Sequence, residues 1–327
     1  MRAVIARALF AAGALAAAFL AVPQPVALGA YPEKAIRWIV PWPPGGGADT
    51  LSRILSPYLS DALKQTIVID NRGGAAGNIG AELAAKAPAD GYTILFAFSG
   101  THAINPHIYK RVPFTEKDFA PIIWLSSVPQ VVVVHPSLPV HSVKELIALA
   151  RKRPGELTYG SSGSGAFNHL TAAMFTTVTG TQITHVPYKG GGPAAVALVA
   201  GEITMILGEP ASVIGFVKAG KVRALAVTSA KRALGMPELP TMQEAGIAGF
   251  EATSWNGMLA PAGTPAEAIK RLNAEFNRMI AEPEVKKRML GSGFEPVGGA
   301  PEAFGAHIRS EIAKWGPVVK AAGVKVD

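Results

Sequence analysis

Residues 31–53 read YPEKAIRWIVPWPPGGGADTLSR, and this stretch decides the fold. Its apolar half predicts a β-strand over 35–41 that ends abruptly at Pro41, because proline lacks the N–H of a strand ladder. The glycines at 45–47 have no Cβ, so the backbone there can approach a ligand closely. Asp49 or Thr50 then starts a helix whose free N–H groups make a partly positive end. A tight strand-to-helix turn without a ligand fits the same residues.

Composition favours a folded α/β protein. The chain has 327 residues, 49% of them hydrophobic, and a mean hydropathy of +0.27, which is enough for one large core or two modest ones. The formal net charge is +8, but the basic residues lie in short, dispersed clusters, so we expect no nucleic-acid binding. The absence of cysteine excludes a disulfide framework, a thiolate metal site and a cysteine nucleophile.

The first 30 residues predict a secretory signal peptide. Arg2 and Arg7 precede an apolar run over 8–22, and prolines and small residues follow, with cleavage expected near Ala30. Loss of the two arginines lowers the formal charge from +8 to about +6. The mature protein is therefore expected in the periplasm.

The chain order predicts two lobes. Strands expected at 35–41, 66–70 and 92–98 alternate with helices, which indicates a parallel sheet with right-handed crossovers. Strands expected at 184–188, 203–207 and 223–228 repeat this pattern. We therefore expect an α/β fold of two lobes, each a mostly parallel sheet flanked by helices: residues 31–127 with 230–327 form the first lobe, and residues 128–229 the second. Two chain crossings then create a hinge and a cleft.

Most enzyme motifs fail on spacing. The loop at 45–50 lacks the third small residue of a dinucleotide site, although Asp70 lies at a suitable distance. A phosphate-binding GK[ST] sequence and an H-E-x-x-H zinc motif are both missing from the sequence. The sequence therefore predicts no cofactor, no metal and no enzymatic activity.

The loop at 160–168, GSSGSGAFN, offers hydroxyls and flexible N–H groups where a helix begins. Its glycines stand at the wrong offsets for a G-x-S-x-G nucleophile. The loop suits holding a carboxylate better than attacking a carbonyl. An exported hydrolase that uses Ser164 and His169 remains the alternative.

One carboxylate and three aromatic residues have two interpretations each. Glu209 follows a predicted strand, where it could accept a hydrogen bond from a ligand amine or hydroxyl, or simply favour the start of a helix. Trp42, Tyr188 and Trp255 lie at loops or strand ends and could line a cleft or pack in the core.

Several motifs together resemble one family. They are YPEKAIRWIVPWPPGGGADTLSR, VIDNRGGAAGNIG, ADGYTILFAFSG, LTYGSSGSGAFNHL, THVPYKGGGPA, VRALAVTS, LPTMQEAG and WNGMLAPAGTP. In this order and spacing they resemble the extracytoplasmic receptors of tripartite tricarboxylate transporters, the Bug receptors. The resemblance implies a periplasmic-binding-protein type II fold, hinged between its lobes, that closes on a small carboxylate. It also implies delivery of the ligand to membrane components of the transporter by a monomeric receptor, and a sensory role is the second alternative.

The resemblance also implies the residues of the ligand site. In this family a carboxylate is typically held by backbone amides, hydroxyls and ordered water rather than by an arginine clamp. The first loop carries Trp42 where many relatives have phenylalanine or tyrosine. The implied ligand-binding residues are Trp42, Gly46, Gly47, Ser99, Thr101, Ser162, Ser164, Gly165, Asn168, Tyr188 and Glu209.

Overall fold

The opening stretch folds as the sequence predicts. Strand β1 (Ile36–Val40) runs into the proline-glycine loop, and helix α2 (Gly47–Leu63) follows it. A computed structural model describes residues 31–324, so the predicted signal peptide lies outside the described residues. Within that range no helix is both long and apolar enough to cross a bilayer. From Lys34 onward the described chain forms one compact unit.

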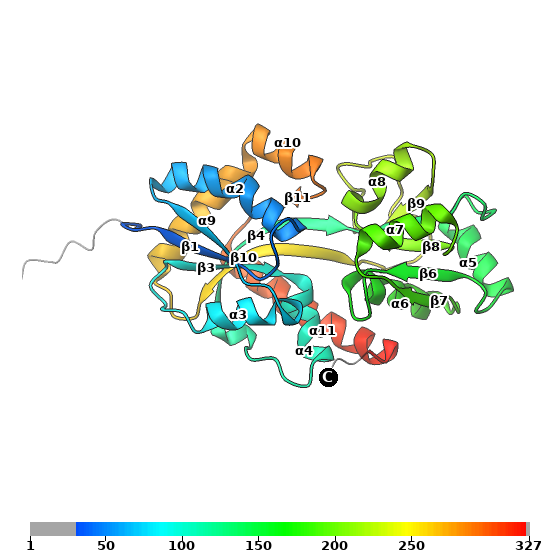
Figure 1. Cartoon of the computed structure of the whole chain (residues 1–327), viewed down its shortest axis with the longest axis horizontal. Helices are drawn as coiled ribbons and strands as arrows, with labels where there is room; N and C mark the ends of the chain where they lie inside the picture. Colours follow the sequence, from blue (N-terminus) through cyan, green and yellow to red (C-terminus); the bar gives the residue numbers. More distant parts are fainter. Residues whose placement is uncertain (1–30, 325–327) are drawn as a thin grey trace, which may run out of the picture. The chain divides into compact units, whose positions relative to one another are not determined.

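The first sheet surrounds β1. It has six strands in the order β11-β4-β10-β3-β1-β2. Helices α2, α9 and α10 lie on one side of it, and α3, α4 and α11 on the other (Figure 1). The other elements of this part are β2 (Ile67–Asn71), α3 (Asn78–Ala85), β3 (Thr93–Phe98), α4 (Asn105–Ile108), β4 (Phe119–Pro129), β10 (Thr253–Pro261), α9 (Ala266–Ala281), α10 (Pro283–Gly291), β11 (Glu295–Pro296) and α11 (Pro301–Ala322).

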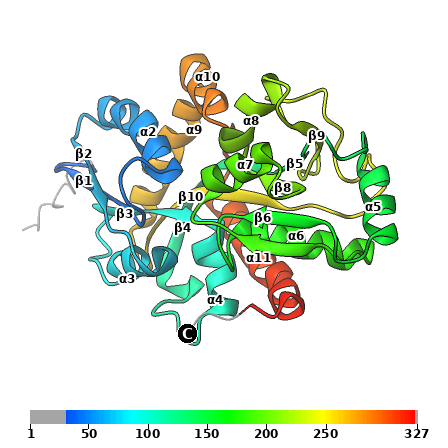
Figure 2. The same ribbon diagram turned by 45° about the vertical axis from the view of Figure 1, so that its right-hand side comes forward.

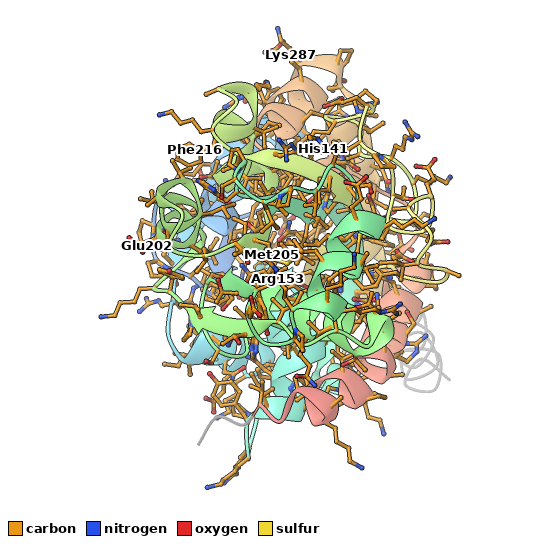
Figure 3. All side chains as sticks on the ribbon, turned by 90° about the vertical axis from the view of Figure 1, so that its right-hand side faces the viewer. His141, Arg153, Glu202, Met205, Phe216 and Lys287 are labelled. Atoms are coloured by element: carbon orange, nitrogen blue, oxygen red, sulfur yellow. The ribbon has the colours of Figure 1, made fainter. Side chains whose placement is uncertain are left out.

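The second sheet has five strands in the order β7-β6-β8-β5-β9. Seen from its far end, Met205 of β8 lies in the interior, with Glu202, Phe216 and Arg153 around it (Figure 3). Its elements are β5 (Val131–Val134), α5 (Val143–Lys152), β6 (Thr158–Ser161), α6 (Phe167–Thr179), β7 (Thr184–Pro187), α7 (Gly191–Ala200), β8 (Met205–Gly208), α8 (Pro210–Lys218) and β9 (Arg223–Val227).

The predicted fold class is confirmed, with one correction: the sheets are mixed rather than mostly parallel. Strand β1 pairs in parallel with β2 and β3, and β6 with β7 and β8. Strand β10 is antiparallel to β3 and β4, and β5 to β8 and β9. The reason is that β5 and β10 each carry the chain away from the junction of the two sheets, whereas their neighbours run toward it (Figure 2). The carboxyl ends of β1, β3, β6 and β8 therefore face that junction.

Two chain segments join the sheets, and we call this place the crossing. One is Gln130, the single residue between β4 and β5, and the other is residues 251–252 before β10. The fully buried Thr228 lies between them. Its hydroxyl accepts a hydrogen bond from the Gln130 amide (2.8 Å) and donates one to the Ala252 carbonyl (2.5 Å). One side chain thus ties both segments together.

Residues 230–250 pack against the second sheet. Thr241 pairs with Val227 of β9, and Ala233 and Met236 are buried in the same core cluster as Val131. We therefore propose that the chain returns to the first lobe near residue 252 instead of near 230, and that the rest of the predicted lobe division stands.

Replacing Thr228 by valine tests the crossing. The change keeps the shape of the side chain but leaves the Gln130 N–H and the Ala252 carbonyl without their partner, so it should lower the free energy of unfolding by about 1–3 kcal/mol. Urea denaturation measures the loss. Thr228→Ser retains the hydroxyl and serves as the control; equal losses in the two variants would contradict the assignment.

Candidate functional site

A continuous cleft lies at the junction of the two sheets. Two adjoining cavities of about 980 and 810 Å³ share part of their lining. The shared residues come from the loop after β1, the end of β3, the turn before α7 and the start of α8: Trp42, Gly46, Gly47, Phe98, Gly190, Glu209 and Ala211. Loops from both sheets thus form a single space.

Asp49 fixes the shape of the first loop. Its buried carboxylate accepts hydrogen bonds from the Gly45 amide (2.9 Å), the Asn71 side-chain amide (3.1 Å) and Arg53 Nε (2.9 Å). The Asn71 amide also donates to the Trp42 carbonyl (3.0 Å). These donors, Arg53 first among them, hold the pKa of Asp49 below its ordinary value, although burial opposes the shift. Helix α2 begins at Gly47 and not at Asp49 or Thr50 as predicted, because the backbone already turns helical within the glycine loop, so Asp49 supports this loop from the first turn of the helix.

The Trp42 ring faces the cleft. It is half-buried and makes an edge-to-face contact with Phe98 at 6.0 Å between ring centroids. Trp255, the other tryptophan with two interpretations, is fully buried against Phe304. The structure therefore settles the two interpretations: Trp42 lines the cleft and Trp255 packs in the core.

The second loop, at 71–77, is held by hydrogen bonds from two buried side chains. Ala75 and Ala76 have φ angles of 47° and 52°, a region that alanine rarely adopts. The Ala76 carbonyl accepts hydrogen bonds from Thr101 Oγ1 (2.9 Å) and Asn105 Nδ2 (3.1 Å). Asn105 and Ala76 line the cleft, whereas Thr101 is fully buried beneath them.

Asn168 organises the third loop, which opens α6. Its Oδ1 accepts hydrogen bonds from the Ser162 amide (3.1 Å) and the Ser162 hydroxyl (2.8 Å). In this assignment the Asn168 Nδ2 has no partner among the described residues, and neither does the exposed Ser164 hydroxyl. Both groups belong to residues that line the cleft, so they remain available to a ligand.

The position of Glu209 agrees with both interpretations, and its contact with a ligand stays a prediction. It directly precedes α8, and its side chain lines the cleft. The residue is exposed to the open cleft, although neighbouring protein partly desolvates its carboxyl. This environment raises the pKa of the Glu209 carboxyl by desolvation, an effect that water in the cleft moderates.

Eight of the predicted ligand-binding residues come together around the cleft, and three lie apart from its lining. Ser99 and Thr101 are fully buried under the loops, and Tyr188 packs against the core cluster of the second sheet. Their predicted contact with ligand remains a prediction. Those that line the cleft are Trp42, Gly46, Gly47, Ser162, Ser164, Gly165, Asn168 and Glu209.

The sequence reasoning missed several lining residues. Ser254 and Asn256 alternate along β10, which is apolar beyond them, and Asn256 Nδ2 donates to Ser126 Oγ at 3.0 Å. Two polar residues at period two in a buried strand were a usable signal. Lys189 and Phe98 carry no such signal, because their exposure to the cleft depends on where the loops fold.

The cleft contains little positive charge. Among the described residues that line its two cavities, Lys189 is a cation and arginine does not occur. An anion here would meet mainly N–H groups and hydroxyls.

The arrangement of His169 does not favour a hydrolase. Its Nδ1 accepts the Gly165 amide at 3.0 Å, and within residues 31–324 no hydrogen bond joins it to Ser164. A serine nucleophile needs a base within hydrogen-bond reach.

Two α/β sheets that enclose a cleft at their junction are the architecture of a two-lobed solute-binding protein. The family model described as "Tripartite tricarboxylate transporter family receptor" matches residues 51–324. The chain belongs to this family, as its motifs suggest.

Individual relatives agree with this assignment. The chain is 36% identical over 307 residues to "Protein BugT" of Bordetella pertussis, which covers 93% of this chain and 94% of that protein. A solved structure described as "R. palustris Rpa4515 with adipate" has 40% identity and a TM-score of 0.78, covering 90% of this chain and 99% of the other. MatC from Rhodopseudomonas palustris, solved with bound malate, has 28% identity and a TM-score of 0.74, covering 88% of this chain and 100% of the other.

Substitution of Asp49 tests its role in the first loop. Asp49→Ala removes the acceptor of three donors and should lower the free energy of unfolding at pH 7 by about 1–3 kcal/mol. Because the folded-state pKa of Asp49 is lowered, its contribution is present above the unfolded pKa, whose reference value is 3.8, and is lost as the pH falls through the folded pKa.

Urea denaturation of wild type and variant at pH 7 and pH 3 checks both statements. Arg53→Ala is the control, since it removes only the exposed partner and should cost less than about 1 kcal/mol. A loss in Asp49→Ala that stays the same at both pH values would rule out the carboxylate as its cause.

Proposed function

We propose that this protein is a periplasmic receptor that captures a small carboxylate in the cleft and delivers it to membrane components of a tripartite tricarboxylate transporter. The observation that carries the proposal is the cleft itself, which takes its lining from both sheets and presents N–H groups and hydroxyls with little positive charge. The relatives solved with adipate and malate support the choice of a carboxylate.

Binding would bring the two sheets together. A ligand that contacts the first loop and the third loop simultaneously has contacts in a closed state that an open state lacks, so it shifts the population toward closure. Gln130 and residues 251–252 are the segments that would bend. The transporter components would then recognise the closed form.

Neutral donors would hold the carboxylate. The Asn168 side-chain amide, the Ser164 hydroxyl and the first N–H groups of α6 are candidates, since the α6 N-terminus has no side-chain cap. Hydrogen bonds from such groups to an ionised acceptor are shorter and stronger than neutral ones. Lys189 would add attraction at the opposite part of the cleft.

A ligand screen tests the proposal. The mature protein is mixed with mono-, di- and tricarboxylates, aromatic acids and acidic amino acids, and its melting temperature is measured. A ligand at 100 times its Kd stabilises the folded state by about 2.7 kcal/mol, which should raise the melting temperature by several degrees. Calorimetry then gives the Kd. Absence of binding across the panel, together with turnover of an ester or amide substrate, would overturn the receptor assignment.

Glu209 is expected to discriminate among carboxylates. Glu209→Gln should weaken a ligand with an adjacent amine or hydroxyl, such as aspartate or malate, by about tenfold or more, because a hydrogen bond to a charged group contributes about 1.5–3 kcal/mol. A plain dicarboxylate such as adipate should change by much less. Calorimetric titration of both ligand types decides the point, and equal effects on both would exclude a selective role.

A further inference from the structure

Two stacked imidazoles lie behind the third loop. His169 of α6 and His185 of β7 pack face to face at 3.8 Å between centroids, with an angle of 8° between their planes. The Tyr159 ring stacks on His185 at 4.9 Å. Neither histidine is among the residues that line the cleft, so neither is placed to touch a ligand.

Each imidazole holds one end of the loop. His169 Nδ1 accepts the Gly165 amide at 3.0 Å, where the backbone has a φ of +79°. His185 Nε2 lies 2.6 Å from Ser161 Oγ. That hydroxyl donates to the Gly163 carbonyl (3.1 Å) and accepts the Gly163 amide (3.2 Å).

His169 must be neutral for this arrangement, because its Nδ1 accepts a hydrogen bond. Burial, followed by the charge of His185, lowers the pKa of His169 to about 4, and burial also lowers the pKa of His185. Tyr159 is the other titratable group that stacks on the pair. A neutral His169 whose Nδ1 accepts a hydrogen bond carries its proton on Nε2.

The partners of His185 assign its tautomer as well. With the single Ser161 hydroxyl proton assigned to the Gly163 carbonyl, His185 Nε2–H is the donor toward Ser161 Oγ. The two histidines thus use opposite properties of the ring: His169 accepts and His185 donates.

We propose that His169 and His185 are positioning residues, which set the shape of the loop at 161–165 and thereby the affinity of the cleft for its carboxylate. This inference rests on the proposed function. The reason for the inference is that most N–H groups of the loop already donate hydrogen bonds within the protein. The amides of Ser162, Gly163 and Gly165 all have such partners. The groups left for a ligand belong to Ser164 and Asn168. Their orientation depends on this internal hydrogen-bond network.

The two histidines should respond differently to acid. Protonation of His169 turns Nδ1 into a donor that faces the Gly165 N–H, so this hydrogen bond is lost. Protonation of His185 leaves its Nε2–H in place and its bond to Ser161 intact. Acid should therefore release the Gly165 end of the loop first.

The test uses His169→Leu, which removes the acceptor, and His169→Asn, whose Oδ1 can replace Nδ1 without titrating. His141→Asn, at an exposed histidine ahead of α5 (Figure 3), is the control for a mere change in histidine content. Two readouts are measured: hydrogen exchange of the Gly165 amide in the ligand-free protein, and the Kd for adipate by calorimetry at pH 7. Circular dichroism confirms that each variant folds.

In His169→Leu the Gly165 amide should exchange at least tenfold faster and the Kd for adipate should rise about tenfold, as expected for the loss of one buried hydrogen bond. His169→Asn should retain both values to within about threefold. In wild type, but not in His169→Asn, the protection of Gly165 should fall as the pH drops toward 4, the pKa of His169.

Unchanged Gly165 exchange in His169→Leu, or faster exchange with an unchanged Kd, would overturn the proposal. If wild type binds neither adipate nor any other carboxylate of the panel, the proposed function fails instead. In that case, hydrogen exchange of the Gly165 amide still shows whether His169 holds the loop.

Discussion

The structure depends on hydrogen-bond partners for the backbone of its loops, which lie outside the regular hydrogen bonding of sheets and helices. The cleft is built from three glycine-rich or serine-rich segments, whose N–H and C=O groups would be costly if left unpaired. A few buried side chains supply the partners. Asp49 serves the first loop, Thr101 and Asn105 the second, and Asn168 the third. Each acts from the element next to its loop, so sheet and helix packing define the shape of the cleft.

This internal pairing also defines what the cleft can offer. The amides that the network uses are not free for a ligand, and the unused donors are few and fixed in direction. Neutral donors on rigid supports recognise an anion by geometry, whereas a flexible cation recognises it mainly by charge. A cleft that is lined by Lys189 but by no arginine among the described residues is consistent with that principle.

The topology places these loops opposite one another. Because β5 and β10 carry the chain away from the crossing, the strands paired with them end at it, and the loops after β1, β3, β6 and β8 face each other across the cleft. Helices α6 and α11 also meet across the junction, where Phe167 contacts Trp315 at 5.0 Å between ring centroids. The closure that we propose would have to keep or repack that contact.

The sequence by itself determined the order of the main strands and helices, the positions of the three loops and the family. These features are local: strand and helix patterns, capping residues and glycine-rich turns are read within a few neighbouring residues. It placed Trp42, Ser162, Asn168 and Glu209 correctly on the loops that line the cleft.

Only the tertiary structure decided which side chains face the cleft and which support it. Ser99 and Thr101 follow a predicted strand like the other site residues, yet both are fully buried beneath the loops. Thr101 and His169 belong to the loop motifs in sequence, but in the structure they lie behind the loops and support them by hydrogen bonds. The deciding contacts join residues far apart in the chain, such as Asn71 with Asp49 and Gln130 with Thr228. Local periodicity does not encode such pairs, because burial and hydrogen-bond partners are properties of the packed whole.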